Sequence, residues 1–219
     1  MLQSGRLCLL LRLVKLSGQI DIDAPEYGGI SSRVPSPPVS HRQLLDENGV
    51  YRCLDQIASE IHRAWPQEPK LALVGIYRRG VPFSESLATR LRAMGREVEL
   101  GRIDITQYRD DLNSFTVLPR LEGSDIRFQL DDAVVILCDE VIYTARTCRA
   151  ALEELLGFGR PRCVELAVLV DRVGRQMPFQ ANYVGISVEL PPDERVNVCF
   201  SAVDGRDEVF VSSWDVKPS

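Results

Sequence analysis

The stretch CDEVIYTART at residues 138–147 has residue types that could do chemistry, at close spacing. Two adjacent carboxylates, Asp139 and Glu140, follow an almost wholly apolar run, and hydroxyl groups come next, just before a segment with helical periodicity. Carboxylates accept hydrogen bonds from hydroxyl groups or bind a metal, and the unpaired N–H groups at the start of a helix attract anions. The stretch therefore predicts a site that could hold a sugar phosphate with free hydroxyl groups.

A second interpretation of this stretch remains open on the residues alone. The two acids could begin a solvated turn, with Thr144 or Thr147 as an ordinary helix cap. Two common phosphate-binding motifs are excluded: the sequence contains neither the GKS or GKT of a Walker loop nor the GxGxxG of a dinucleotide-binding turn.

The elements around the stretch determine where its side chains can lie. Residues 133–138 and 163–170 are apolar runs typical of buried strands, and residues 147–157 between them have helical periodicity. This order predicts two parallel strands joined by a right-handed crossover, with ligands bound beyond the carboxyl ends of the strands. The further predicted elements are a helix between the cap Asn48 and the stop Pro66, strands at 70–76, 97–105 and 196–200, a helix at 83–95, a long loop at 106–124 and a hairpin around Asp204 and Gly205.

Length and composition limit the possible classes of protein. The 219 residues are enough for one α/β domain with a tail, and we predict a disordered extension and linker at 1–38 and one folded domain at 39–219. The apolar run near the N-terminus is too short to span a bilayer. A net charge of −5 gives no global attraction to nucleic acid or to an anionic membrane. The six scattered cysteines do not indicate a zinc site and favour a reducing, cytoplasmic location.

Five segments, taken in order, resemble the PyrR family of pyrimidine operon attenuators and uracil phosphoribosyltransferases. These are LVGIYRRGVP (73–82), GRIDITQYRDDL (101–112), VVILCDEVIYTARTCRAAL (134–152), VLVDR (168–172) and GRQMPFQANYVGISV (174–188). The resemblance implies a type I phosphoribosyltransferase fold, in which helices flank a central, mainly parallel sheet that carries a small hood. It also implies the substrates uracil and 5-phosphoribosyl 1-diphosphate, the product UMP, the cofactor Mg²⁺, a homodimer or larger homo-oligomer, and no membrane partner.

The resemblance also implies site residues. Asp139 and Glu140 would hold the ribose hydroxyls and bind Mg²⁺ indirectly, through ribose or water, and Arg109 would close over the diphosphate with its loop. Taken without the resemblance, an arginine pair before a helix, such as Arg78 and Arg79, reads as surface charge. The residues implied to bind 5-phosphoribosyl 1-diphosphate are Arg78, Arg79, Asp139, Glu140, Val141, Ile142, Tyr143, Thr144, Ala145, Arg146 and Thr147. Arg172, which its chemistry alone would make an ordinary strand-end charge, and the backbone near Val196 are implied to line the uracil pocket.

Two departures from the family pattern DDVLYTGRT matter, namely Glu140 in place of the second aspartate and Ala145 in place of glycine. Glutamate keeps the charge, and alanine costs about 1 kcal/mol if its φ is positive. In the segment that grips RNA in the family, cationic positions are occupied by Gly174, Gln180 and Ile186, although Arg175 remains. Because phosphate contacts dominate nucleic-acid affinity, we expect weakened RNA binding.

Three functions are therefore considered, in decreasing order of support. The first is a uracil phosphoribosyltransferase that forms UMP and diphosphate. The second is an RNA-binding attenuator of pyrimidine genes that responds to uridine nucleotides, and the third is a catalytically weak nucleotide sensor.

Overall fold

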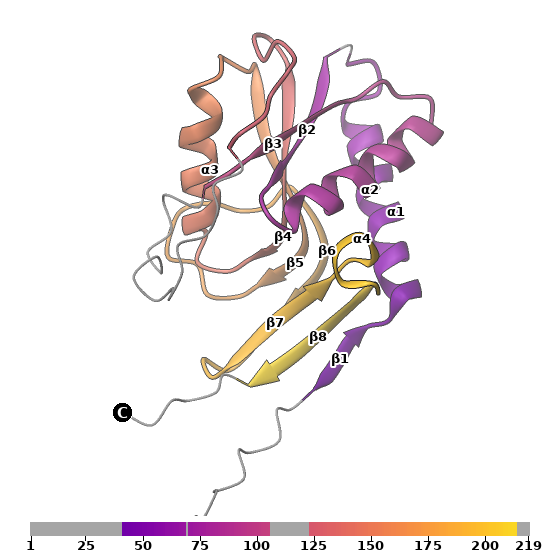
Figure 1. The fold of residues 1–219 in the computed structure, drawn as a ribbon, viewed down its shortest axis with the longest axis vertical. Helices are drawn as coiled ribbons and strands as arrows, with labels where there is room; N and C mark the ends of the chain where they lie inside the picture. Colours follow the sequence, from indigo (N-terminus) through magenta and orange to yellow (C-terminus); the bar gives the residue numbers. More distant parts are fainter. Residues whose placement is uncertain (1–40, 69, 106–122, 214–219) are drawn as a thin grey trace, which may run out of the picture. The chain divides into compact units, whose positions relative to one another are not determined.

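Five parallel strands form the central sheet of the computed structural model, in the order β3-β2-β4-β5-β6 (Figure 1). Their neighbours pair in parallel throughout, which confirms the predicted parallel sheet. The runs LALVGI and VVILC are buried at every position, as expected of strands covered on both faces. The strands are β2 (Leu71–Ile76), β3 (Glu99–Ile103), β4 (Val134–Ile142), β5 (Cys163–Arg172) and β6 (Tyr183–Val188). The structure describes residues 41–68, 70–105 and 123–213.

Three helices cover the two faces of this sheet (Figure 1). Helices α1 (Glu47–Ala64) and α2 (Gly80–Ala93) share one apolar cluster with the strands, and α3 (Arg146–Leu156) belongs to a second cluster on the other face. Within the described residues, no helix combines the length and the apolar character needed to cross a membrane. The layered arrangement leaves the carboxyl ends of the strands as the edge where the predicted site lies.

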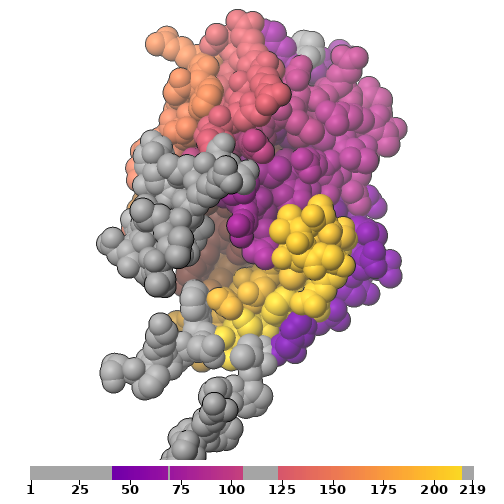
Figure 2. Space-filling model, viewed as in Figure 1, coloured from indigo at the N-terminus to yellow at the C-terminus, as the bar shows by residue number. Residues whose placement is uncertain are grey.

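A second, antiparallel sheet forms the hood, which we define as β1 (Arg42–Leu45), β7 (Glu194–Cys199), α4 (Ser201–Asp204) and β8 (Glu208–Ser213). Its strands are ordered β1-β8-β7. The ring of Phe200 lies 6.2 Å from that of Phe83 on α2, so the hood shares the apolar cluster of α1 and α2. In the space-filling view, the yellow surface of α4 lies against the purple surface of α2 (Figure 2).

Three local expectations differ from the structure. The cap of α1 is Asp46, not Asn48, since the Asp46 carboxylate accepts a hydrogen bond from the N–H of Gly49 at 2.7 Å. Strand β4 continues to Ile142 instead of ending at residue 138, because the parallel partner β5 continues alongside it. The expected hairpin around Asp204 contains the helical turn α4, which ends at Gly205 with φ of 73°.

Candidate active site

The ends of β2 and β4 lie side by side, because the two strands pair in parallel with Gly75 opposite Cys138. Helix α2 starts directly after β2, and a side chain at Gly80 would place its Cβ 2.3 Å from the carbonyl oxygen of Cys138. Only glycine permits this approach of the backbone to β4. The YRRG turn and the acidic pair are thus brought to the same edge of the sheet.

The acidic pair lies in the second half of β4. Asp139 is 5% exposed and accepts a hydrogen bond from the N–H of Glu140 at 3.0 Å, while Glu140 is half-buried. Successive side chains of a strand point to opposite faces. The hydrogen bond to Asp204 is the main cause that raises the pKa of Arg79, and the charge of Glu140 adds to it. Burial is the main cause that raises the pKa of Cys148, and the charge of Asp139 adds to it. The two carboxylates therefore serve different sides of the strand end.

Residues 143–147, which we call the phosphate turn, connect β4 to α3. Ala145 is in the left-handed conformation with φ of 69° and occupies the N-cap position, and no side chain of the described residues caps α3 there. The part of the alternative interpretation that makes Thr144 or Thr147 an ordinary helix cap is therefore wrong. The N–H of Arg146 reaches the Thr144 hydroxyl only at 3.5 Å, the limit of a hydrogen bond. The start of α3 keeps the geometry that attracts an anion.

The connector between β5 and β6, residues 173–182, is hydrogen-bonded to the phosphate turn. The N–H groups of Gln176 and Met177 both donate to the Thr144 carbonyl at 3.1 Å. The Nε of Arg146 donates to the side-chain oxygen of Gln176 at 3.2 Å. The turn is therefore bonded through its backbone and a side chain to a segment that follows the next strand of the sheet.

Arg172 ends β5 and is only 5% exposed, so it is not the exposed strand-end charge that its chemistry alone indicates. It donates to the Pro191 carbonyl at 2.9 Å, and its guanidinium carbon lies 4.0 Å from the centre of the Tyr143 ring. Its buried Nε has no hydrogen-bond partner among the described residues. A buried donor without a partner costs free energy, so a ligand acceptor at this position would be favoured. Val196, the other expected uracil contact, is on β7, after Pro191.

The two arginines after β2 have different surroundings. Arg78 is exposed and follows a cis peptide bond from Tyr77. Arg79 forms a bidentate ion pair with Asp204 of the hood, in which Nη2 lies 2.9 Å from Oδ1 and Nε lies 3.3 Å from Oδ2. The hydrogen bond to Asp204 raises the pKa of Arg79, and the same bond lowers the pKa of Asp204. Asp204 is thus a site residue that the sequence analysis missed, because no local sequence pattern indicates a partner 125 residues away.

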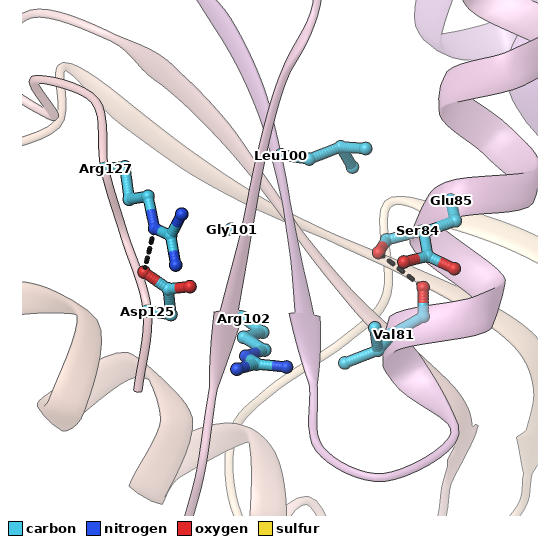
Figure 3. A pocket seen from close by; sticks show the side chains of 8 residues that line it. All are labelled: Val81, Ser84, Glu85, Leu100, Gly101, Arg102, Asp125 and Arg127. Carbon is cyan, nitrogen blue, oxygen red and sulfur yellow. Dashed lines mark hydrogen bonds and ion pairs between the residues drawn. The ribbon is translucent and has the colours of Figure 1, made fainter. Parts of the chain in front are cut away.

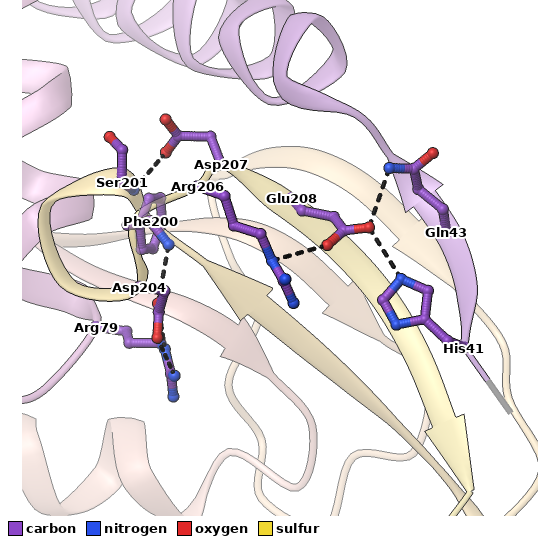
Figure 4. A network of polar contacts seen from close by, with 9 residues as sticks. All are labelled: His41, Gln43, Arg79, Phe200, Ser201, Asp204, Arg206, Asp207 and Glu208. Carbon is purple, nitrogen blue, oxygen red and sulfur yellow. Dashed lines mark hydrogen bonds and ion pairs between the residues drawn. The ribbon is translucent and has the colours of Figure 1, made fainter. Parts of the chain in front are cut away.

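Asp204 belongs to a polar network that connects the site to the hood (Figure 4). Its carboxylate also accepts the N–H of Phe200 at 3.0 Å. At the start of β8, Glu208 accepts a hydrogen bond from Gln43 and pairs with His41 and Arg206. Asp204 therefore anchors Arg79 to the beginning of α4.

An open pocket of about 370 Å³ lies elsewhere, between α2, β3 and residues 125–127 (Figure 3). It contains none of the predicted site residues, and Arg127 at its rim is paired with Asp125 at 2.8 Å. The implied catalytic residue Arg109 falls outside the described residues.

Comparisons with known proteins converge on one family. The model of the phosphoribosyl transferase domain family matches residues 40–202. The chain is 43% identical over 170 residues to a bifunctional protein PyrR from Pelotomaculum thermopropionicum, covering 77% of this chain and 94% of that protein. It is 42% identical over 167 residues to a protein of the same name from Deinococcus radiodurans, covering 76% and 91%.

Solved structures share the fold at much lower identity. A hypoxanthine phosphoribosyltransferase from Trypanosoma cruzi superimposes with a TM-score of 0.63 at 19% identity, covering 81% of this chain and 93% of that chain. A hypoxanthine-guanine phosphoribosyltransferase from Bacillus anthracis gives a TM-score of 0.57 at 16% identity, covering 80% and 99%. These structures support the predicted type I phosphoribosyltransferase fold.

Proposed function

This chain belongs to the PyrR family of phosphoribosyltransferases, and from that premise we propose that it transfers the phosphoribosyl group of 5-phosphoribosyl 1-diphosphate to uracil. The observation that carries this proposal is the acidic pair at the end of β4, followed within a few residues by the uncapped start of α3. Acceptors for ribose hydroxyls and donors for a phosphate are thus only a few residues apart in the chain, as the binding of one sugar phosphate would require.

In this reaction the N1 atom of uracil attacks C1′ of the ribose, the bond from C1′ to the diphosphate oxygen breaks, and the N1 proton is released. The products are UMP and diphosphate. Positive charge develops on the ribose in the transition state, and the Asp139 and Glu140 carboxylates stabilise it. The phosphate turn binds the 5′-phosphate through the N–H groups that begin α3.

The diphosphate needs cations at the other end of the substrate. Arg78 is exposed at the end of β2, and Arg79 lies beside it in its ion pair with Asp204. Arg109 is proposed to complete this set, in line with the family resemblance. Together these arginines would stabilise the charge of the leaving group.

Mg²⁺ fits the site as an ion held mainly by the substrate. The described residues include no group of three or more histidine, cysteine or acidic side chains that could form a closed metal site. Mg²⁺ is usually bound by one or two carboxylates together with substrate phosphates and water, and Asp139 and Glu140 would supply such contacts indirectly, through the ribose or through water. When bound, the ion would neutralise the charge of the leaving diphosphate.

Uracil is proposed to lie against the buried end of β5. The Arg172 Nε is a donor with no partner in the described part of the chain, and a pyrimidine carbonyl oxygen is an acceptor of suitable chemistry. The hood backbone near Val196 would form the opposite wall.

The test is UMP formation from labelled uracil and 5-phosphoribosyl 1-diphosphate, with and without Mg²⁺. Asp139→Asn should lower kcat/KM on the order of a hundredfold, because it removes a charge aimed at the developing cation. Asp132→Asn is the matched control, since Asp132 is exposed at the opposite end of the same strand and has φ of 62°, which asparagine tolerates. Uracil turnover that is absent from the wild type, or unchanged in Asp139→Asn, would contradict the proposal.

A second candidate function is attenuation of pyrimidine genes through RNA binding, which the family resemblance implies and with which the word "bifunctional" in the names of the relatives agrees. Gly174 and Gln180 are exposed uncharged residues at positions where the family carries cations. Each lost phosphate contact lowers RNA affinity. We therefore rank catalysis first and propose that RNA binding is weak.

The proposed location is the cytoplasm. The cysteines of the described residues are all free thiols, as a reducing compartment requires. Burial is the main cause that raises the pKa of Cys138 and Cys148, and it keeps these thiols protonated and inert. A homodimer or larger homo-oligomer is also proposed, from the family resemblance.

A further inference from the structure

Arg175 makes more hydrogen bonds than any role in RNA binding requires. Its Nη1 donates to the carbonyl of Tyr143 at 2.7 Å and to that of Arg172 at 3.1 Å, and its Nε donates to the carbonyl of Phe179 at 3.0 Å. Its Nη2 pairs with Asp171 at 2.6 Å. A guanidinium has five N–H groups, so most of its donors are directed into the protein.

Three of the four acceptors belong to the two halves of the proposed substrate site, and the fourth belongs to the connector. The Tyr143 carbonyl begins the phosphate turn, whereas the Asp171 carboxylate and the Arg172 carbonyl form the end of β5 that faces the uracil position. The Phe179 carbonyl fixes the connector at its far side. One planar, rigid group therefore joins the turn that would hold the phosphate to the strand end that would hold the base.

A second contact links the same two segments. The Arg172 guanidinium stacks on the Tyr143 ring at 4.0 Å, and the ring passes so close to Gly174 that a Cβ there would lie 2.3 Å from it. Gly174 has φ of 137°, a conformation that other residues rarely adopt. Glycine at position 174, where the family carries a histidine, thus allows the Tyr143 ring to pack against the backbone of the connector.

We propose that Arg175 is a positioning residue that couples the phosphate turn to the base-binding end of β5, so that each half of the site is organised by the other. The inference deepens the proposed function and depends on it for the identity of the ligand. Arg175 is not a catalytic residue here, because its donors are used inside the protein and do not face the substrate. For the same reason it is a poor contact for RNA phosphates.

The first test is hydrogen exchange in the ligand-free protein, which requires no turnover. The N–H groups of Gln176 and Met177 are bonded to Thr144 and should be protected. In Arg175→Met they should exchange about tenfold faster or more, since the loss of charged hydrogen bonds loosens the turn. Arg90→Met is the matched control, because Arg90 also bonds a carboxylate and a backbone carbonyl, but on α1 and α2. Equal exchange of these amides in Arg175→Met and in the wild type would overturn the inference.

The second test is binding of UMP, which spans both halves, and of ribose 5-phosphate, which fills only one. Calorimetry should show both ligands weakened by about tenfold or more in Arg175→Met, with UMP affected more, and both within twofold of wild type in Arg90→Met. Arg175→Lys keeps a cation beside Asp171 but cannot reach the separate carbonyls, so it should fold normally and still bind UMP weakly. Unchanged UMP affinity in both Arg175 variants, with only a lower Tm, would make Arg175 a structural residue. Binding and exchange as expected in a wild type that does not convert uracil would sink the proposed function and leave this inference standing.

Discussion

Arg175 and Arg79 lie at two parts of the same site and are held in opposite ways. Arg175 donates to three backbone carbonyls and one carboxylate, and its side chain is 21% exposed. Arg79 bonds a single carboxylate, Asp204, and its side chain is 38% exposed.

The difference indicates which arginine organises and which one binds. Backbone carbonyls cannot leave their partner without disturbing the fold, so Arg175 is committed to the protein. A single exposed carboxylate can be exchanged for an anionic ligand at small cost, because surface ion pairs contribute little. Arg79 therefore has a held orientation and an accessible charge, as diphosphate binding would require.

The largest expected effect that sharpens this comparison is that of Gly174→Ala. The new Cβ would meet the Tyr143 ring and would sit at an unfavourable φ, so the free energy of unfolding should fall by about 2 kcal/mol. The displaced ring would leave Arg172, so KM for uracil should rise about threefold to tenfold. Urea denaturation and initial-rate kinetics measure the two effects.

Gly95→Ala is the control for that change. Gly95 also has positive φ, at 80°, but nothing lies within 4 Å of a Cβ added there. It should lower stability without changing KM for uracil. A similar rise of KM in both variants would break the link between Tyr143 and the base site.

An intermediate effect is expected from Asp204→Asn. The hydrogen bond from Arg79 lowers the pKa of Asp204, so the pair contributes stability above the ordinary carboxyl pKa, and this contribution is lost as the pH falls through the lowered pKa. At pH 7 the variant should be less stable by about 1 kcal/mol, an amount that allows for solvent screening. The difference should shrink as the pH falls below the ordinary carboxyl pKa and vanish once it is below the lowered pKa of Asp204.

Kinetics of Asp204→Asn would sharpen the role of Arg79. A freed Arg79 loses its orientation, so KM for 5-phosphoribosyl 1-diphosphate should rise more than KM for uracil. Glu194→Gln is a suitable control, because Glu194 pairs with Arg42 elsewhere in the hood. A stability difference that persists unchanged at acidic pH would show that the ion pair is not its source.

The smallest effect is expected from Ala145→Gly. Relief of the left-handed φ of 69° gains about 1 kcal/mol. The Ala145 methyl is buried, and its removal costs about 0.8 kcal/mol, while glycine adds unfolded-state entropy. Urea denaturation should therefore show a change within about 1 kcal/mol of zero. A gain well above this range would mean that the alanine strains the turn more than its packing offsets.

The sequence was sufficient for the layers of the fold and for the local part of the site. Strand β2 and residues 134–138 of β4 are continuous apolar runs, and α1 has a clear apolar face, so their types could be predicted, although Asp46 and not Asn48 caps the helix. The acidic pair and the phosphate turn were found because their residues are adjacent.

The rest of the site depends on pairings between distant residues. Arg79 meets Asp204, and Arg175 meets Tyr143, through the fold alone. Burial of Arg172 follows from its position at the end of an inner strand, between the Tyr143 ring and the Pro191 carbonyl, which no local pattern indicates.

The most direct test of the central claim is a crystal structure of the protein with UMP and Mg²⁺. We expect the phosphate oxygens to lie about 3 Å from backbone nitrogens of residues 144–147 and the uracil ring to lie beside Arg172. A phosphate bound elsewhere, for example between Arg102 and Arg127 in the pocket of Figure 3, would contradict it.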